Sequence, residues 1–280
     1  MDVIYQVMNT LLPFEALQFT FMKNAFLAIL LLTPLLGLLG TMAVNKQMAF
    51  FSDALGHSAL TGIGLGIVLG VSNDLLSMLV FGIVWAIMIS RIKQTGAAST
   101  DTIISVFSST SVALGLIILA RGGGFAKYSA LLIGDVLAVT QQDLLWLLLA
   151  LIGGTALWMT MYNRLLLSSV NASLARSRGV RVQLIECMFV VLVAVAVMLA
   201  IRWVGVMLIN ALLILPAAAG RNIARNARQH AVCSVLIAML CGIGGLFAAY
   251  AWDTSAGAAI VLFAAGCYAL SLGVRTLLNR

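Results

Sequence analysis

An aspartate and a histidine four residues apart, Asp53 and His57, stand in an otherwise apolar stretch, "MAFFSDALGHSALTGIGLGIVLG", at residues 48–70. Residues four apart lie on one face of an α-helix, one turn above another, and Thr61 continues the same polar edge. The spacing therefore places a carboxylate and an imidazole together at the head of an apolar helix. One carboxylate oxygen and one neutral imidazole nitrogen suit divalent ions such as zinc, manganese or iron(II).

Two ligands alone leave such an ion site incomplete. A homodimer with this helix near its two-fold axis would bring two aspartates and two histidines together. That four-ligand site could bind an ion and release it when its halves move apart. In the alternative interpretation, Asp53 caps the helix or lies in its first turn, and His57 is hydrogen-bonded within a helix bundle. The residues themselves leave both interpretations open.

Small residues follow a second line on the same predicted helix. Ser58, Gly62, Gly66 and Gly70 recur in steps of four beside the Asp53–His57 edge. In lipid, a stripe of small residues lets a second helix approach closely. We therefore expect this helix to pack tightly on one side, with the aspartate and the histidine next to the seam.

The composition identifies the environment of these helices. Of 280 residues, 62% are hydrophobic and 9% are charged, whereas soluble domains have about 25% charged residues. The chain is thus expected to be all-α, a polytopic integral membrane protein with eight or nine transmembrane helices in a single domain over residues 1–280. The N-terminus has no basic region before its apolar run, which argues against a cleaved signal peptide. The predicted spans are 24–45, 54–72, 74–90, 102–120, 142–162, 184–201, 203–220, 230–251 and 254–274.

Three further segments carry structural expectations. Residues 129–138 are expected to form a short re-entrant or interfacial helix, and the polar segment 162–183 to form a loop. Asn210 and Pro216 lie inside the span 203–220, so that helix is expected to bend and to line a pathway.

The basic residues indicate the orientation. With the N-terminus outside and the C-terminus in the cytoplasm, twelve of the sixteen Lys and Arg residues fall on the cytoplasmic side, as the positive-inside rule requires. The net charge of +7 is thereby explained by the membrane, without a nucleic-acid partner. Glu186 is expected to pair with a nearby arginine at the cytoplasmic edge.

Two sequence patterns limit the chemistry. The chain has no GxxxxGK[ST] motif and no Gly-Lys pair, so it cannot bind ATP through a P-loop of its own. Its four cysteines lie in apolar runs without CxxC spacing. They are interpreted as buried small apolar residues rather than a metal or redox cluster.

Four ordered stretches resemble one family. "MAFFSDALGHSALTGIGLG" (48–66) is similar to the second-helix signature of the permeases of ABC-type zinc, manganese and iron importers, the ABC-3 family. "LIGDVLAVTQQDL" (132–144), "VGVMLINALLILPAAAGRNIARN" (204–226) and "WDTSAGAAIVL" (252–262) look like the same family in the same order. The resemblance covers nearly the whole chain, from about residue 24 to 275.

The resemblance implies a type II ABC importer-like permease in the cytoplasmic (inner) membrane, working by alternating access. It implies a second permease subunit in a homodimer, separate ABC ATPase subunits and an extracytoplasmic metal-binding protein. Asp53 and His57 match the residues implicated in the family's metal path. The cargo is a divalent zinc, manganese or iron ion, and no bound organic cofactor is expected.

The resemblance also implies a contact with the ATPase. The basic segment 218–230 is similar to the coupling helix of the related cobalamin-type importers. Its residues expected to couple are Arg221, Asn222, Arg225, Asn226 and Arg228. Residues 171–180 are a second candidate contact. An ordinary basic cytoplasmic loop is the alternative for both.

One departure from the family concerns the ion. Some zinc permeases of the family carry a further histidine in the span that starts near Asp101. Here "TDTIISVFSSTSVALG" (100–115) has serines and no histidine. This difference leaves the ion open and disfavours a histidine-rich zinc site.

Two rival functions remain. A secondary, ATPase-independent metal or proton-coupled transporter would work without an ATPase, and such transporters often have inverted repeats, which are not evident here. An intramembrane hydrolase would need a nucleophile or a metal triad, and a single histidine in the membrane argues against it.

Overall fold

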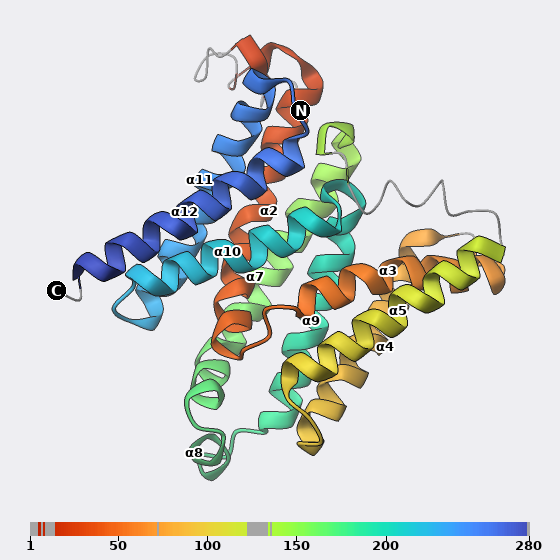
Figure 1. The fold of residues 1–280 in the computed structure, drawn as a ribbon, viewed down its shortest axis with the longest axis vertical. Coiled ribbons are helices and arrows are strands. Elements are labelled where there is room, and N and C mark those ends of the chain that lie inside the picture. Colours follow the sequence, from red (N-terminus) through yellow and green to blue (C-terminus); the bar gives the residue numbers. More distant parts are fainter. Residues whose placement is uncertain are drawn as a thin grey trace. The chain divides into compact units, whose positions relative to one another are not determined.

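The computed structural model describes residues 15–71, 73–121, 134 and 136–278, together with Tyr5, Gln6 and Met8. In this part of the chain there are helices and no strands (Figure 1). The expected all-helical fold is therefore confirmed. Long apolar runs favour helices in a membrane because a helix satisfies its backbone hydrogen bonds within its own segment.

Nine helices of 18 residues or more occur in the described residues, and they follow the nine predicted spans. They are α2 (Thr20–Asn45), α3 (Phe51–Val68), α4 (Asp74–Thr95), α5 (Thr100–Arg121), α7 (Gln141–Val170), α9 (Val182–Val204), α10 (Val206–Ile223), α11 (Ala227–Trp252) and α12 (Ala256–Leu278). Shorter elements are η1 (Glu15–Gln18), η2 (Val136–Ala138) and α8 (Ala172–Ser177).

Seven of the nine long helices in the described part of the chain have the length and composition to cross a membrane: α2, α4, α5, α7, α9, α11 and α12. The other two are α3 and α10. These are the helices that carry Asp53 with His57 and Asn210 with Pro216. Asp53 and His57 thus lie on a helix outside this set of seven, and Asn210 and Pro216 lie on the shorter apolar helix Leu208–Ile223.

The loop predicted at 162–183 is wrong over most of its length. α7 continues to Val170 as a helix of 30 residues, because Leu165, with no exposed surface, continues its buried face while Arg164 lies exposed. The chain then forms α8, where the Asn171 side chain accepts a hydrogen bond from the Leu174 amide at 3.0 Å. Of the helix predicted at 129–138, the structure describes only Gly134 and the 3-10 turn η2; the remainder lies outside the described residues.

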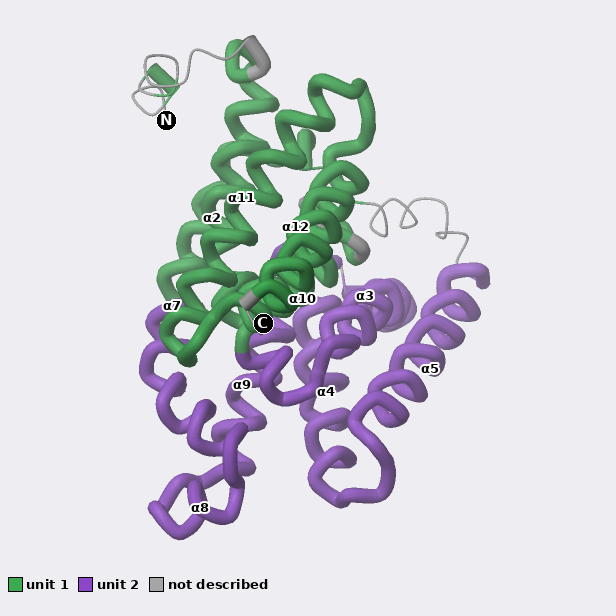
Figure 2. Tube along the Cα trace, turned by 60° about the vertical axis from the view of Figure 1, so that its left-hand side comes forward, with its two compact units in different colours: residues 1–41, 133–153, 203–280 green, residues 42–132, 154–202 purple. Residues whose placement is uncertain are grey.

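The chain folds into two compact units, which Figure 2 shows in different colours. Unit 1 consists of residues 1–41, 133–153 and 203–280. Unit 2 consists of residues 42–132 and 154–202. Both units are therefore built from segments that are far apart in the sequence.

Unit 1 is held by close backbone approaches at glycine. α10, α11 and α12 pack against one another, and a Cβ at Gly245 of α11 would lie 2.8 Å from the Ile260 amide nitrogen of α12. A Cβ at Gly40 of α2 would lie even closer to the carbonyl oxygen of Leu213 in α10. Helices this close gain dispersion contacts that a larger side chain would prevent.

Unit 2 contains an ion pair in which the lysine is buried and the glutamate side chain is 24% exposed. The Lys46 Nζ atom lies 2.8 Å from Glu186 Oε1 and donates a hydrogen bond to Ser168 Oγ at 3.1 Å. Only 5% of the Lys46 side chain is exposed. Lys93 donates to the Lys46 carbonyl at 3.4 Å. The turn between α2 and α3 is thus joined to α4, α7 and α9. The prediction that Glu186 pairs with a nearby arginine is wrong. Its partner is Lys46, 140 positions away in the sequence.

We predict that Gly245→Ala lowers the stability of the folded chain by about 1–3 kcal/mol, because the added methyl group must push α11 and α12 apart. The measurement is the midpoint of thermal unfolding in detergent, followed by size-exclusion chromatography. Gly153→Ala in α7 is the matched control, since no atom lies within 4 Å of a Cβ there. An equal drop in both variants would contradict the packing argument.

For the ion pair, we predict that Glu186→Gln destabilises the fold by about 3–5 kcal/mol, because it leaves the Lys46 charge buried without its partner. The double variant Lys46→Met with Glu186→Leu removes both charges and should recover most of that loss. The same thermal measurement checks both. A double variant as unstable as Glu186→Gln would show that the unpaired Lys46 charge is not the cause of the lost stability.

Candidate metal site on α3

Asp53 and His57 lie side by side at the start of α3. Asp53 is in the first turn, and the N-cap position belongs to Phe50, which makes no side-chain capping hydrogen bond. The His57 Nε2 and Asp53 Oδ2 atoms are 3.6 Å apart, and the two side chains are 31% and 36% exposed. This distance is too long for a firm hydrogen bond. The carboxylate and the imidazole are thus adjacent without a firm hydrogen bond between them. Two ligands of one ion need this arrangement.

The small residues of α3 have different surroundings. Ser58 is fully buried and its hydroxyl bonds the Leu55 carbonyl at 2.7 Å. A Cβ at Gly62 would lie 3.0 Å from the Ser77 carbonyl of α4, and one at Gly66 would meet the Ser77 side chain. Gly70 differs, because α3 ends at Val68: it has a φ of +72° and nothing within 4 Å of a Cβ. Gly70 therefore serves the turn after the helix, a conformation that glycine adopts readily.

The polar edge of α3 faces α5. The Thr61 hydroxyl donates a hydrogen bond to the Ser111 carbonyl, and a Cβ at Gly115 would lie 2.9 Å from Thr61 Oγ1. The absence of a side chain at Gly115 lets the two helices meet at this level. The line from Asp53 through His57 to Thr61 therefore runs beside α5.

A cavity of about 250 Å³ opens beside Asp53. Its lining residues are Phe50, Asp53, Asp101, Ile104, Ser105, Ser108 and Ser109. The sequence analysis used Asp101 only to locate the start of a span, and it noted the serines of that span only because some relatives carry a histidine there. The available signal was their spacing, since residues 101, 105 and 108 recur at helical steps on one face of α5.

The site is not a complete metal cage within the chain. Among the described residues, no group of three or more His, Cys, Asp and Glu side chains could hold an ion. The incompleteness expected from the sequence therefore persists in the single chain. Asp53 and His57 remain a pair of candidate ligands, which would need further ligands from other oxygen atoms, from water or from a partner subunit to complete an ion site.

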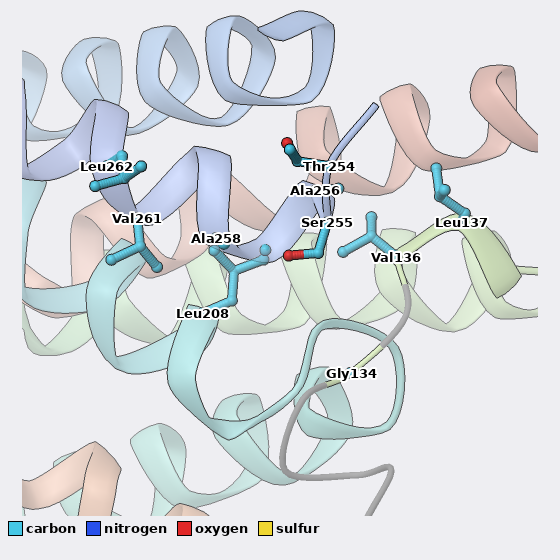
Figure 3. A pocket seen from close by; sticks show the side chains of 11 residues that line it. Gly134, Val136, Leu137, Leu208, Thr254, Ser255, Ala256, Ala258, Val261 and Leu262 are labelled. Atoms are coloured by element: carbon cyan, nitrogen blue, oxygen red, sulfur yellow. The ribbon is translucent and has the colours of Figure 1, made fainter. Parts of the chain in front are cut away.

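Asn210 and Pro216 lie on α10, in unit 1. Pro216 is buried within the helix, where its ring leaves the Leu212 carbonyl without its usual helical donor. Near the start of α10, Leu208 lines a cavity of about 710 Å³ with Val136, Ala258 and Val261 around Ser255 (Figure 3). Among the described residues, no charged side chain lines this cavity, so these residues offer hydroxyl groups but no ionic ligand. A pathway role for Asn210 and Pro216 stays a prediction.

The basic segment 218–230 is mostly helical rather than a loop. α10 continues to Ile223 and α11 begins at Ala227, so that only residues 224–226 separate them. The Asn226 side chain caps α11 by accepting from the Gln229 amide at 2.9 Å. The Asn222 amide donates to Ser271 of α12 at 3.0 Å. These two asparagines therefore hold the connection in place.

The arginines of this segment lie on the surface. Arg221, Arg225 and Arg228 are all exposed. Behind them, His230 is buried, with Nε2 2.9 Å from the Ala217 carbonyl. A tight, internally bonded helical turn thus presents three positive charges on its surface, a form suited to contact with a partner.

Comparison with known sequences identifies relatives over nearly the whole chain. The family model of the ABC 3 transport family matches residues 18–275. The manganese import system permease protein ScaB of Streptococcus parasanguinis is 32% identical over 256 residues, covering 91% of this chain and 90% of the relative. The high-affinity zinc uptake system membrane protein ZnuB of Haemophilus influenzae is 30% identical over 255 residues, covering 91% and 97%.

Solved structures show the same fold. A chain of PsaBC from Streptococcus pneumoniae, in complex with Fab, matches with a TM-score of 0.79 and 27% identity, over 97% of this chain and 95% of that chain. A putative metal-chelate type ABC transporter in an inward-facing conformation matches with a TM-score of 0.69 at 17% identity, over 91% and 85%. That second match concerns the fold alone. The family match and the sequence identities establish that the chain belongs to the ABC 3 transport family.

Proposed function

We propose that the chain is the transmembrane permease subunit of an ABC importer for a divalent metal ion, and that Asp53 and His57 lie on the ion path. The observation that carries the proposal is the adjacent carboxylate and imidazole on α3, 3.6 Å apart, with side chains 36% and 31% exposed. Ionisable side chains within apolar helices are costly, so they usually mark a functional path. Relatives named for manganese import and zinc uptake support this class of cargo.

The energy source is a separate ATPase subunit, because the chain has no P-loop of its own. An extracytoplasmic metal-binding protein delivers the ion, and a second copy of the permease completes the pathway. The N-terminus lies outside and the C-terminus in the cytoplasm, so that the segment 218–230 and α8 face the ATPase. In this arrangement the chain hydrolyses no ATP itself.

Transport then follows an alternating-access cycle. The loaded binding protein docks on the outer face and releases the ion into the pathway. Closure of the ATPase subunits on ATP moves the permease helices through the exposed arginines of the 218–230 segment. The ion is held transiently by Asp53 and His57, whose incomplete ligand set allows its release to the cytoplasm.

We predict that Asp53→Asn and His57→Gln each lower metal uptake by roughly tenfold or more, because each removes one of the two proposed ion ligands. Uptake of manganese, zinc and iron is measured in cells that carry the complete importer, with expression matched. Ser58→Ala is the control on the same helix, since its hydroxyl bonds only the local Leu55 carbonyl.

This experiment also separates the rival transporter. Uptake that continues with a hydrolysis-deficient ATPase would favour a secondary transporter. Normal uptake by both variants would place the ion path elsewhere in the chain. Loss of uptake with an assembled, ATP-hydrolysing complex supports the proposal.

A second prediction concerns coupling. Arg225→Glu should weaken copurification with the ATPase and lower the permease-stimulated hydrolysis of ATP, because it reverses one exposed charge of the contact. Arg164→Glu, an exposed arginine within α7, is the matched charge reversal outside the segment. Equal behaviour of the two variants would assign the arginines of 218–230 to an ordinary basic surface.

A further inference from the structure

One side chain, Asn222, bonds the C-terminal part of α12 to the last turn of α10. Its Nδ2 atom donates a hydrogen bond to Ser271 Oγ at 3.0 Å, and its Oδ1 atom accepts one from Arg275 Nη1 at 3.3 Å. Ser271 and Arg275 are four residues apart, so they lie on one face of α12 in successive turns. A single amide therefore holds two turns of α12 against the basic segment 218–230.

Asn222 differs from the arginines beside it in where its side chain is directed. Ser271, to which it bonds, is only 2% exposed, whereas Arg221 and Arg225 are exposed. The amide thus faces the interior of unit 1, while the guanidinium groups lie at the surface. The segment therefore has an outward side, which can meet a partner, and an inward side, which is joined to α12.

Close packing joins the same segment to α11. A Cβ at Gly220 would lie 3.0 Å from the Ser234 amide nitrogen of α11, and His230 of α11 hydrogen-bonds the Ala217 carbonyl of α10. A movement of the segment therefore moves the adjoining ends of α10 and α11 together. The hydrogen bonds of Asn222 extend this movement to α12.

The other end of α12 lines the cavity of about 710 Å³ that Figure 3 shows. Ala258, Val261 and Leu262 of α12 line it together with Leu208 of α10 and Val136 of η2. The helix has 23 residues and no proline, so it is about 34 Å long at a rise of 1.5 Å per residue. One continuous helix thus joins the basic segment to this cavity.

Resting on the proposed function above, we propose that α12 transmits movement of the 218–230 segment to the cavity end of unit 1, and that Asn222 is the positioning residue that joins the segment to α12. Closure of the ATPase subunits pushes on the exposed arginines, and Asn222 carries α12 with the segment through Ser271 and Arg275. In the proposed orientation the cavity end lies on the outer side. Docking of the binding protein outside and hydrolysis of ATP inside are then coupled through the same helix.

The test is the number of ATP molecules hydrolysed per Mn²⁺, Zn²⁺ or Fe²⁺ ion taken up by the complete importer in proteoliposomes. This ratio reports coupling, because a loss of folded complex lowers both rates equally and leaves the ratio unchanged. Ser271→Ala removes the acceptor of the Asn222 amide and leaves the 218–230 segment as it is. We expect it to raise the ratio by about two- to tenfold, the effect of one lost hydrogen bond. Asn222→Leu should raise the ratio at least as much.

Asn222→Asp is the conservative variant. A carboxylate at this position accepts hydrogen bonds from both Arg275 and the Ser271 hydroxyl, so it should keep the ratio near that of the wild type. Thr276→Ala is the matched control for the loss of a hydroxyl group, because Thr276 is an exposed residue of α12 whose hydroxyl bonds the Gly273 carbonyl at 2.7 Å. It should leave the ratio unchanged. Copurification with the ATPase verifies that each complex is assembled.

The outcomes separate this inference from the proposed function. A wild-type importer that takes up none of the three ions with ATP overturns the proposed function and the inference with it. With a transporting wild type, equal ratios for Ser271→Ala and Thr276→Ala overturn the inference alone, even where Asn222→Leu fails to assemble. So does a raised ratio for Asn222→Leu without one for Ser271→Ala, because Asn222 then acts on the ATPase directly. A raised ratio in both variants, with the wild-type ratio in Asn222→Asp, supports the link through α12.

Discussion

The Nζ atom of Lys46 lies 2.8 Å from Glu186 Oε1, with only 5% of the lysine side chain exposed. A charge buried to this degree persists only when an opposite charge and hydrogen-bonding groups surround it. Ser168 of α7 and Glu186 of α9 provide these groups, and the Lys46 carbonyl accepts from Lys93 of α4. Within unit 2, the turn before α3 is therefore held by three other helices. Because Asp53 follows that turn by only a few residues, the position of the candidate ligand depends on this one interaction.

The distances between α3 and its neighbours α4 and α5 depend on a second constraint, the glycines at the helix contacts. Gly62 and Gly66 let α4 approach on one face, and Gly115 lets α5 approach on another. The ion pair anchors the start of the helix, while the glycines fix how deeply it lies between its neighbours. Together they place Asp53 at a cavity rather than against a wall of packed side chains.

Most helices could be predicted from the sequence, because a membrane span needs a long apolar run and such runs are visible without knowledge of tertiary contacts. The adjacency of Asp53 and His57 was also predictable, since it follows from helical spacing alone. The partner of Glu186 was not, because Lys46 lies far away in the sequence and only the fold brings the two together. The same holds for Asp101, which shares a cavity with Asp53 only through the register of α3 against α5. Gly70 was misplaced for a local reason: the stripe of small residues continues past the point where α3 ends.

The weakness of the ligand set follows from the demands of transport. A structural zinc site with four strong ligands binds with an apparent free energy of about 10–16 kcal/mol, and an ion held so tightly would leave too slowly to be transported. Here the two candidate ligands are 31% and 36% exposed, and the cavity beside Asp53 adds serine hydroxyls, which are weaker ligands than thiolates or imidazoles. On the proposed path an ion would keep part of its water shell. The energy differences between successive positions are then small. When these energy differences are small, modest movements of the helices can change which position the ion prefers. Alternating access supplies such movements.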